Sequence, residues 1–382
     1  MKKVLIVSSV ASMIDQFNKD NIKILQELGY EVHVATNFEN PGTITSERSN
    51  QLKKYLEKEK VKYYQVDFDR NPLNLTEFKK AKRQLRQLSG VNDYEFVHLH
   101  SPIGGIIGRI IFGKSKTKVI YTAHGFHFFK GAPLKNWLIY YPIEKYFSRC
   151  TDILITINAE DYNFSQKKLK AKRTEFINGV GVDTKLFKQF SEEEKEKIRN
   201  KNGFNNDDFL LIYVGELSQR KNQDYLIDVM SEIKKKEIKL LLVGKGPLEE
   251  TLKQKVKEKN LEENISFLGY RSDVSDLMGM SDVVVSASKQ EGLPVNLIEG
   301  LCEGKPLIVS DCRGNRDLVE DGVNGFVIGE YSDKNFSDKV FELYYSDRKR
   351  NEFSYESIGI SKKYDIKYVH KQMLEIYKCE DV

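Results

Sequence analysis

Short apolar runs alternate with amphipathic segments along most of the chain. In the first half, β-rich runs such as 4–8 and 31–36 precede segments whose apolar residues recur at helical spacing. Strands that alternate with helices form parallel sheets with crossover helices. The expected strands of this half are residues 4–8, 31–36, 63–67, 96–100, 119–122 and 153–157, and the expected helices include 16–28, 47–59, 77–88 and 135–149.

The alternation pauses near residue 180 and then resumes. The pause holds Asn-Gly-Val-Gly-Val-Asp at 178–183 and a charged segment at 191–202. We therefore expect two Rossmann-like α/β domains, 1–178 and 207–364, joined by a linker at 179–206 and facing each other across a cleft. A last amphipathic segment, about 365–382, is expected to pack back on the first domain. The strands expected in the second domain are 210–214, 239–243, 265–267, 282–286, 306–309 and 325–328.

Composition is that of a soluble protein of 382 residues, with 40% apolar and 31% charged residues. The apolar start of the chain resembles a signal peptide but ends at Ser8, which favours a buried first strand. The longest apolar stretch, 103–112, is far shorter than the roughly 20 residues of a membrane span. Four cysteines without a C-x-x-C pair favour a reducing, cytoplasmic setting; they are Cys150, Cys302, Cys312 and Cys379.

Charge is distributed unevenly along the chain. Residues 1–178 hold 29 Lys and Arg against 18 Asp and Glu, a net charge of +11, whereas the rest has a net charge of −6. The predicted helix 77–88 contributes a basic outward face. This face is either simply solvated or attracts anionic lipid or acidic partners. Nucleic acid is not an expected partner, because no recognition motif accompanies the charge.

Two glutamates eight residues apart, Glu291 and Glu299, form the most informative pair. Glu291 follows the apolar run 283–286, and Glu299 lies about two turns into the helix expected next. Pro294 suits the first turn of that helix, which leaves the amides of residues 293, 295 and 296 free to bind an anion. Since ligands of doubly wound folds bind at such strand ends, a phosphate beside a hydroxyl-rich group would fit. The alternative is that Glu291 merely ends a strand and Glu299 is solvated.

Two adjacent cations, Arg220 and Lys221, stand at the entrance of another expected helix, after the turn at Gly215. Positive charge is unfavourable at a helix N-terminus, and a bound diphosphate would resolve the conflict. Exposed loop cations are the alternative. Gly244 repeats the strand-and-glycine turn, and the backbone around Arg271 follows the next strand, where it could contact a base edge.

Four histidines cluster in the first half: His98, His100, His124 and His127. His98 and His100 share one strand face, as metal ligands can. No H-E-x-x-H or D-x-D motif accompanies them, so we expect no metal site and expect backbone hydrogen bonds at His98. His124 follows the strand 119–122 and should face the cleft opposite Glu291.

Several of these motifs together resemble the retaining glycosyltransferases of the GT4 type, which have the GT-B fold of two facing Rossmann domains. They are residues 215–222, Gly244-Lys245-Gly246, Leu268-Gly269 and the Glu291-x7-Glu299 pair. Residues 101–105 (Ser-Pro-Ile-Gly-Gly) and 122–127 (Thr-Ala-His-Gly-Phe-His) are similar to segments of bacterial capsule and exopolysaccharide enzymes. The resemblance covers nearly the whole chain and rests on the order and spacing of the motifs.

The resemblance implies a role for each site residue. Glu299 would accept hydrogen bonds from ribose hydroxyls, and Arg220 and Lys221 would neutralise the diphosphate as the sugar bond breaks. Glu291, with the Gly292 and Leu293 amides, would contact the donor sugar, and His124 would close over that sugar. The implied catalytic residues are His124, Glu291, Arg220 and Lys221; the donor-binding residues are Gly215, Arg220, Lys221, Gly244, Arg271, Glu291, Gly292, Leu293, Asn296, Leu297 and Glu299; the acceptor side comprises Ser9, Ser12, His124 and His127.

Two positions depart from the family pattern. Relatives often have arginine directly after the first glycine, where this chain has Glu216, so the positive charge rests on Arg220 and Lys221. The turn at 8–12 lacks the glycine pair that many relatives have near the acceptor.

The resemblance implies transfer of a sugar from a nucleotide-diphosphate sugar, UDP by default, to a lipid-linked glycan in cell-surface polysaccharide synthesis. It also implies retention at the anomeric carbon, with no metal and no cofactor. Such an enzyme would be cytoplasmic and peripheral on the inner face of the membrane, which its basic first domain would contact. Three alternatives stay open: a sugar-nucleotide epimerase, a phosphorylase of the same fold, and a non-catalytic sugar-nucleotide-binding protein.

Overall fold

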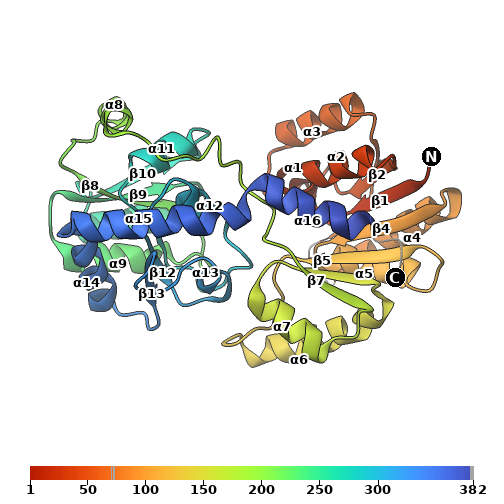
Figure 1. The fold of residues 1–382 in the computed structure, drawn as a ribbon. Helices are drawn as coiled ribbons and strands as arrows, with labels where there is room; N and C mark the ends of the chain where they lie inside the picture. Colours follow the sequence, from red (N-terminus) through yellow and green to blue (C-terminus); the bar gives the residue numbers. More distant parts are fainter. Residues whose placement is uncertain (70, 72–73, 379–382) are drawn as a thin grey trace. The chain divides into compact units, whose positions relative to one another are not determined.

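The computed structural model describes residues 1–69, 71 and 74–378. They form two compact α/β units. The first comprises Met1–Val180 together with the last helix from Val369 onward, and the second comprises Gly181–Tyr368. In each unit, helices cover both faces of a parallel sheet (Figure 1). Cys379 and the end of the expected last segment, 379–382, lie outside the described residues.

The first unit holds a seven-stranded sheet with the order β3-β2-β1-β4-β5-β6-β7, in which every neighbouring pair is parallel. All six strands expected from the sequence are present, and β7 is an additional edge strand. The strands are β1 (Lys3–Val7), β2 (Glu31–Thr36), β3 (Lys62–Gln65), β4 (Tyr94–His100), β5 (Lys118–Ala123), β6 (Ile153–Thr156) and β7 (Arg173–Phe176).

The helices of the first unit include the four that the sequence predicts. The expected helix 16–28 is divided at Asn18 into two shorter ones. The last helix, α16, buries Val369, Met373, Ile376 and Tyr377 at helical spacing. The helices are α1 (Ala11–Phe17), α2 (Lys19–Glu27), α3 (Ser46–Lys58), α4 (Leu75–Val91), α5 (Pro102–Phe112), α6 (Leu134–Phe147), the 3-10 turn η1 (Ser148–Cys150), α7 (Ala159–Lys168) and α16 (Ile366–Lys378).

The second unit repeats this architecture with a six-stranded parallel sheet of order β10-β9-β8-β11-β12-β13. All six expected strands are present. They are β8 (Phe209–Val214), β9 (Ile238–Val243), β10 (Ile265–Gly269), β11 (Val283–Ser286), β12 (Leu307–Ser310) and β13 (Gly325–Ile328). The helices are α8 (Glu192–Asn202), α9 (Gln223–Ile233), α10 (Glu249–Glu258), α11 (Val274–Met280), α12 (Val295–Cys302), α13 (Arg313–Arg316), α14 (Asp333–Tyr344), α15 (Asp347–Ser361) and the 3-10 turn η2 (Lys362–Tyr364).

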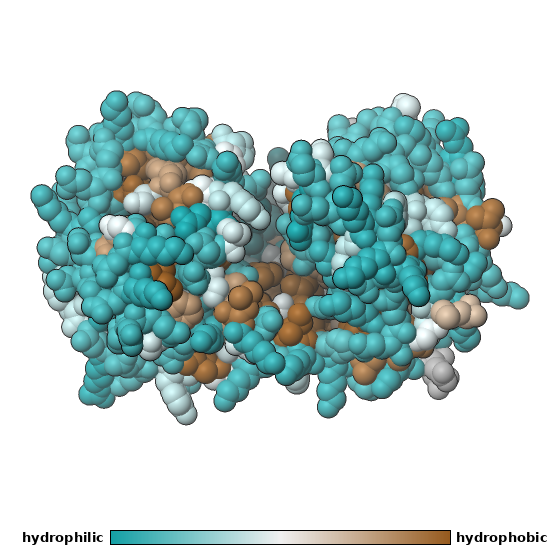
Figure 2. All heavy atoms as spheres, turned by 90° about the horizontal axis from the view of Figure 1, so that it is seen from above, coloured by the Kyte–Doolittle hydropathy of each residue, from teal (hydrophilic) through white to brown (hydrophobic). Residues whose placement is uncertain are grey.

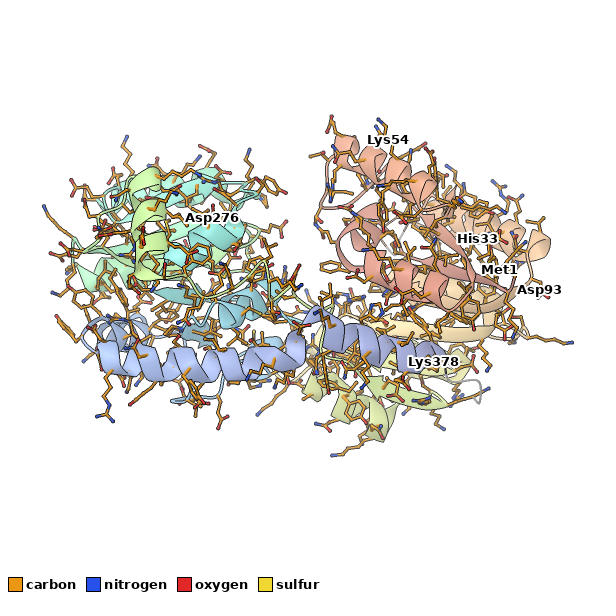
Figure 3. All side chains as sticks on the ribbon, turned by 45° about the horizontal axis from the view of Figure 1, so that its top comes forward. Met1, His33, Lys54, Asp93, Asp276 and Lys378 are labelled. Atoms are coloured by element: carbon orange, nitrogen blue, oxygen red, sulfur yellow. The ribbon has the colours of Figure 1, made fainter. Side chains whose placement is uncertain are left out.

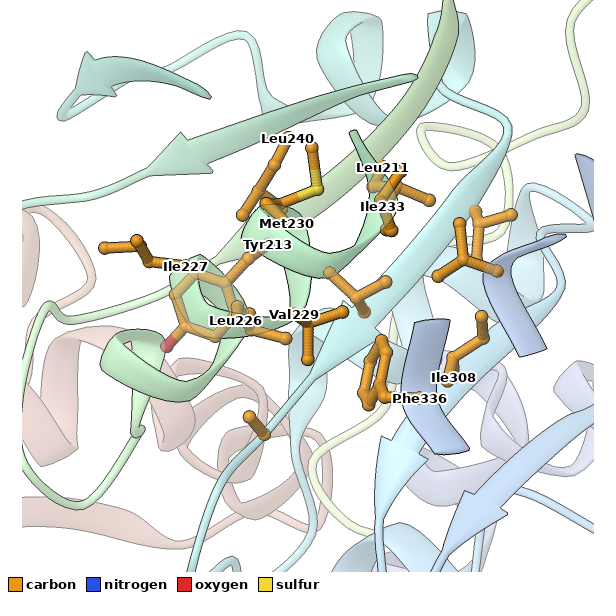
Figure 4. Close-up of a cluster of buried hydrophobic side chains, with 14 of the residues drawn as sticks. Leu211, Tyr213, Leu226, Ile227, Val229, Met230, Ile233, Leu240, Ile308 and Phe336 are labelled. Atoms are coloured by element: carbon orange, nitrogen blue, oxygen red, sulfur yellow. The ribbon is translucent and has the colours of Figure 1, made fainter. Parts of the chain in front are cut away.

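The core of the second unit has two layers because successive strand residues point to opposite faces of the sheet. Leu211 and Tyr213 of β8 pack on one side, and Leu210 and Ile212 pack on the other. Figure 4 shows the first layer, in which α9 lies against the strands with Leu226, Val229, Met230 and Ile233.

Many charged side chains of the helices point outward, whereas some polar side chains of the strands are buried and hydrogen-bonded. In Figure 3, Lys54 projects outward from α3, whereas His33 lies among the strands. The ring nitrogens of His33 are bonded to Tyr94 Oη at 2.9 Å and to Glu31 Oε1 at 3.0 Å. Cys150, Cys302 and Cys312 are free thiols. Among the described residues, no helix is both long enough and apolar enough to cross a membrane.

Candidate functional site

The second sheet reverses its direction of growth between β8 and β11. These two strands are hydrogen-bonded neighbours, although three helices and two strands separate them along the chain. In an open parallel sheet, ligands bind outside the carboxyl ends of the strands at such a switch point. The loops 215–222 and 287–294, which follow β8 and β11, leave the sheet at this place.

Glycine turns after β8 and β9 bring two backbone segments into direct contact. Gly244 has φ +134°, and a Cβ atom there would stand 2.0 Å from the Gly215 carbonyl oxygen. The Leu217 amide donates to the Lys245 carbonyl at 3.1 Å, and the Gly244 amide donates to Gly269 at 2.8 Å. The glycine turns predicted from the sequence therefore fix the loops after β8, β9 and β10 to one another.

Arg220 and Lys221 lie immediately before α9, as the sequence predicts. The N-cap Asn222 has φ +58°, and its side chain makes no capping hydrogen bond. Gln223 organises the loop instead: its amide nitrogen donates to the Glu216 carbonyl at 2.7 Å, and its oxygen accepts from the Ser218 amide at 3.2 Å. Nothing in the sequence distinguishes this glutamine from an ordinary helix residue.

The Glu291 carboxylate is the partner of both cations. Lys221 Nζ lies 2.5 Å from Glu291 Oε1, and Arg220 Nη1 lies 3.2 Å from Oε2. Glu291 and Lys221 are largely buried, with 7% and 12% of their side chains exposed, whereas Arg220 is 45% exposed. Glu291 therefore offsets part of the positive charge at this helix end, and the binding of a diphosphate by the two cations stays a prediction. Two positive charges and one negative charge still leave the cluster with an excess positive charge.

The loop after Glu291 presents unused amides. Among the residues that the structure describes, the amides of Gly292, Leu293, Val295 and Asn296 have no acceptor. We expected Pro294 in the first turn of α12, but it is the N-cap of that helix. Arg313 Nε holds the loop by donating to the Glu291 carbonyl at 3.2 Å. Free amides at a helix start form an anion site.

Glu299 is the fifth residue of α12, so it lies little more than one turn into the helix rather than two. Within the described part of the chain, its carboxyl group has no hydrogen bond or ion pair. Burial raises the pKa of this carboxyl to about 8. A carboxyl group in such surroundings gains from any ligand that offers hydroxyl groups.

Three other predicted donor residues are already engaged in the fold. The Asn296 side chain donates to the Val214 carbonyl at 2.8 Å and so ties α12 to β8. Leu297 is fully buried, and its amide donates to the Pro294 carbonyl at 3.2 Å. The Arg271 guanidinium is bonded to Asp273 at 2.7 Å and to Asn202 at 3.2 Å, and it holds the pKa of Asp273 below its usual value.

The first sheet has its own switch point, between β1 and β4, where two serines meet. Ser9 Oγ accepts from Ser101 Oγ at 2.8 Å and from the Gly104 amide at 2.9 Å. Ser12 lies buried in α1, on the turn that follows. The structure thus brings Ser9 and Ser12 to the carboxyl end of the first sheet, and their role on the acceptor side stays a prediction.

His124 follows β5 directly and pairs with a second histidine. Its Nε2 lies 3.0 Å from His100 Nδ1, so one ring nitrogen donates a hydrogen bond to the other. Burial lowers the pKa of His124 to about 4 and that of His100 well below its usual value, which keeps both rings neutral. His100 Nε2 is buried without a partner among the described residues. The position of His124 opposite Glu291 stays a prediction, because the two residues belong to different units.

The remaining histidines have structural partners. His98 bonds Thr122 Oγ1 and Tyr377 Oη, both at 2.7 Å, so the prediction of backbone partners was wrong. No sequence signal could have linked His98 to a tyrosine 279 positions away. The His127 ring packs on Tyr140 at 4.6 Å. Within the described residues, no group of three or more His, Cys, Asp or Glu side chains could hold a metal ion.

Known proteins resemble the chain over its whole length. The sequence family "Glycosyl transferases group 1" matches residues 194–358, and "Glycosyl transferase 4-like" matches residues 3–158. A protein of Bacillus subtilis (strain 168) named "Putative glycosyltransferase EpsD" is 36% identical to this chain over 385 residues. The match covers 99% of this chain and 97% of EpsD. A UDP-Gal:alpha-D-GlcNAc-diphosphoundecaprenol alpha-1,3-galactosyltransferase of Escherichia coli is 30% identical over 289 residues, covering 73% of this chain and 74% of that protein.

Solved structures agree in fold. Alr3699/HepE of Anabaena, crystallised with UDP and glucose, superposes with a TM-score of 0.79 at 20% sequence identity, and the match covers 99% of both chains. At this identity the likeness concerns the two-unit architecture alone.

Proposed function

The chain belongs to the group 1, GT4-like glycosyltransferases and has the GT-B fold, and we propose that it transfers a sugar from UDP to a lipid-linked glycan acceptor with retention at the anomeric carbon. The observation that carries the proposal is the cluster at the β8–β11 switch point. There, Arg220 and Lys221 meet Glu291 beside four amides and the Glu299 carboxyl, all of which are without a partner in the described part of the chain.

The charges of this cluster suit a diphosphate. Two cations against one carboxylate provide an excess positive charge, and the free amides at the start of α12 add donors without adding charge. As the bond between the anomeric carbon and the diphosphate oxygen breaks, its electron pair goes to that oxygen. Lys221 and Arg220 stabilise this negative charge in place of a metal ion.

Glu299 suits the ribose of the same nucleotide. Its carboxyl lies on α12, one turn beyond the free amides, and keeps its proton at neutral pH because its pKa is about 8. The protonated form donates one hydrogen bond and accepts others, which matches a pair of neighbouring hydroxyl groups. Glu291 then lies between the diphosphate and the sugar.

We assign no covalent nucleophile. The anomeric carbon becomes oxocarbenium-like, the acceptor oxygen bonds to it on the face that the diphosphate leaves, and the acceptor proton passes to the departing phosphate oxygen. Ser9, Ser12 and His124 form the acceptor and sugar side of this proposal. Their placement at the carboxyl ends of β1 and β5 supports it.

The choice of donor and acceptor draws on relatives. The name of the Escherichia coli relative contains UDP-Gal and a diphosphoundecaprenol acceptor, and the Anabaena structure contains UDP. We propose the same classes of substrate here, in a cytoplasmic protein that is peripheral on the inner membrane face. No metal or other cofactor enters the proposed reaction.

The proposal is tested by incubating the protein with a panel of nucleotide sugars and lipid-linked acceptors and identifying products by mass spectrometry and NMR. We expect one UDP-sugar to give a glycosylated lipid whose new bond has the donor's anomeric configuration. An inverted linkage would overturn retention, and a changed sugar still on UDP would indicate an epimerase. A pyridoxal absorption band would indicate a phosphorylase, and binding without any turnover would indicate a non-catalytic binding protein.

A further inference from the structure

One helix of the first unit exposes an unusual set of large apolar side chains. In α6, Leu134 is 73% exposed, Leu138 69%, Ile139 54% and Tyr146 60%. Their spacing of four, five and twelve residues places them on one side of the helix. Single exposed apolar residues are normal on protein surfaces, whereas a row along one helix marks a contact surface. Hydrophilic side chains cover most of the molecular face in Figure 2.

The opposite side of α6 is firmly packed. Trp137 and Tyr141 lie against the Phe164 ring, with centroid distances of 5.7 and 5.5 Å. Glu144 accepts two hydrogen bonds from the buried Arg109, at 2.8 and 3.1 Å. Because these contacts fix the rotation of α6, its outward apolar side is a stable feature of the fold.

The outward side is also cationic. Lys135, Lys145 and Arg149 are exposed at positions that follow the same side of the helix, which continues into η1. Glu144 is the one acidic residue between positions 130 and 149, and Arg109 already binds it. A surface that exposes apolar residues beside Lys and Arg, with no free carboxylate, suits an anionic membrane: the long cationic side chains can reach lipid phosphates while the apolar ones enter the boundary below them.

We propose that α6 is the surface through which this protein docks on an anionic lipid bilayer. The apolar side chains would enter the boundary between headgroups and acyl chains, and the three cations would contact lipid phosphates. A second copy of the chain fits this surface less well, because a two-fold contact would place this positively charged surface against itself. The proposal rests on the proposed function in one respect: docking is useful to the enzyme because it brings it to a lipid-linked acceptor.

Helix α4, the basic helix found in the sequence, has no row of exposed apolar residues beside its cations. Its exposed residues include Lys79, Arg83 and Arg86, whereas the apolar residues between them are buried in the core. Its exposed large apolar residues, Leu75 at 65% and Val91 at 77%, stand at the two opposite ends of the helix. This helix therefore offers mainly general electrostatic attraction.

The test is flotation of the full-length protein with phosphatidylcholine vesicles that contain or lack phosphatidylglycerol. We expect binding only with the anionic lipid. Each cation near such a surface contributes roughly a factor of five to binding, so K135Q/K145Q/R149Q should bind roughly a hundredfold more weakly. L138S/I139S, which keeps all the charges, should also bind at least about tenfold more weakly. The matched control K79Q/R83Q/R86Q on α4 removes the same number of charges and should weaken binding much less than the α6 variant, because α4 only adds to the general attraction.

Equal weakening by the α4 and α6 variants would overturn the proposal, as would unchanged binding of both α6 variants. So would a wild-type dimer, seen by light scattering, that L138S/I139S converts to a monomer. All substituted residues are exposed, and circular dichroism checks that the variants are folded. Sugar transfer to a detergent-solubilised acceptor is measured in parallel. An α6 variant that loses vesicle binding but keeps sugar transfer would support α6 as the docking surface. A wild-type protein that binds vesicles but transfers no sugar would count only against the proposed function.

Discussion

Replacing Glu291 by glutamine separates the structural role of this carboxylate from nucleotide binding. Glu291 is 7% exposed and holds Lys221 at 2.5 Å and Arg220 at 3.2 Å. Removing one partner of a fully buried ion pair costs about 3–5 kcal/mol. Glutamine keeps an acceptor for Lys221, and Arg220 reaches solvent, so we expect a smaller loss of about 2 kcal/mol in unfolding free energy.

Nucleotide binding should respond in the opposite sense. The substitution raises the excess of positive charge at the cluster from one to two, and this excess faces the proposed diphosphate site. Glu291→Gln should therefore bind UDP at least as tightly as the wild type, while sugar transfer falls. The assays are urea unfolding, calorimetric UDP titration and transfer to a lipid-linked acceptor. The control is Glu216→Gln, which changes an exposed glutamate in the same cluster of loops.

Two results would refute this reasoning. Unchanged stability of Glu291→Gln would mean that the two ion pairs contribute nothing to the fold. UDP affinity weakened by about tenfold or more, a loss of about 1.4 kcal/mol, would mean that the cations need their carboxylate to bind the nucleotide.

Two further predictions concern Glu299 and Gly244. The folded state holds the Glu299 proton up to a pKa of about 8, whereas the unfolded chain releases it near a pKa of 4.5, so unfolding releases a proton between these values and the fold weakens as pH rises through them. Urea unfolding between pH 5 and 9 should show Glu299→Gln gaining stability relative to the wild type by up to about 1.4 kcal/mol per pH unit, and parallel curves would contradict the burial argument. Gly244→Ala should cost about 3 kcal/mol in unfolding free energy, because its Cβ would stand 2.0 Å from the Gly215 oxygen at φ +134°. Gly329→Ala, where nothing lies within 4 Å, is the control, and equal unfolding midpoints for the two variants would disprove the clash.

Strands were predictable where they are central and apolar. Runs such as 209–214 and 238–243 are buried on both faces, so their hydrophobic residues are nearly continuous. Edge strand β7 was missed because all four of its residues are half-buried and two of them are charged. An edge strand pairs on one side only and needs no apolar run.

Helix α5 was not assigned because three of its eleven residues are glycine, a poor helix former. The structure shows why glycine is needed: a Cβ at Gly108 would stand 2.4 Å from Leu99 of β4. Close packing against the sheet outweighs helix propensity here, and such packing is visible only once the sheet exists.

The sequence predicted which positions form the candidate site, but not which of their side chains pair with each other. The spacing of Glu291 and Glu299, and the cations before α9, follow from strand-and-helix order alone. The ion pairs between Glu291 and residues 70 positions earlier depend on β8 and β11 becoming neighbours, which the chain order does not reveal. For the same reason Gln223, His98 and Tyr377 gave no signal.

Sugar transfer by Lys221→Ala, compared with the wild type in the same acceptor assay, tests the central claim most directly. Lys221 is the less exposed of the two cations, and removing one charge partner of a transition state typically costs about 10² in rate or more. The matched control is Lys236→Ala, an exposed lysine just beyond the opposite end of α9. We predict a loss of about a hundredfold or more for Lys221→Ala and none for Lys236→Ala. A folded Lys221→Ala protein that transfers sugar at the wild-type rate would contradict the assignment of this cluster to the donor diphosphate.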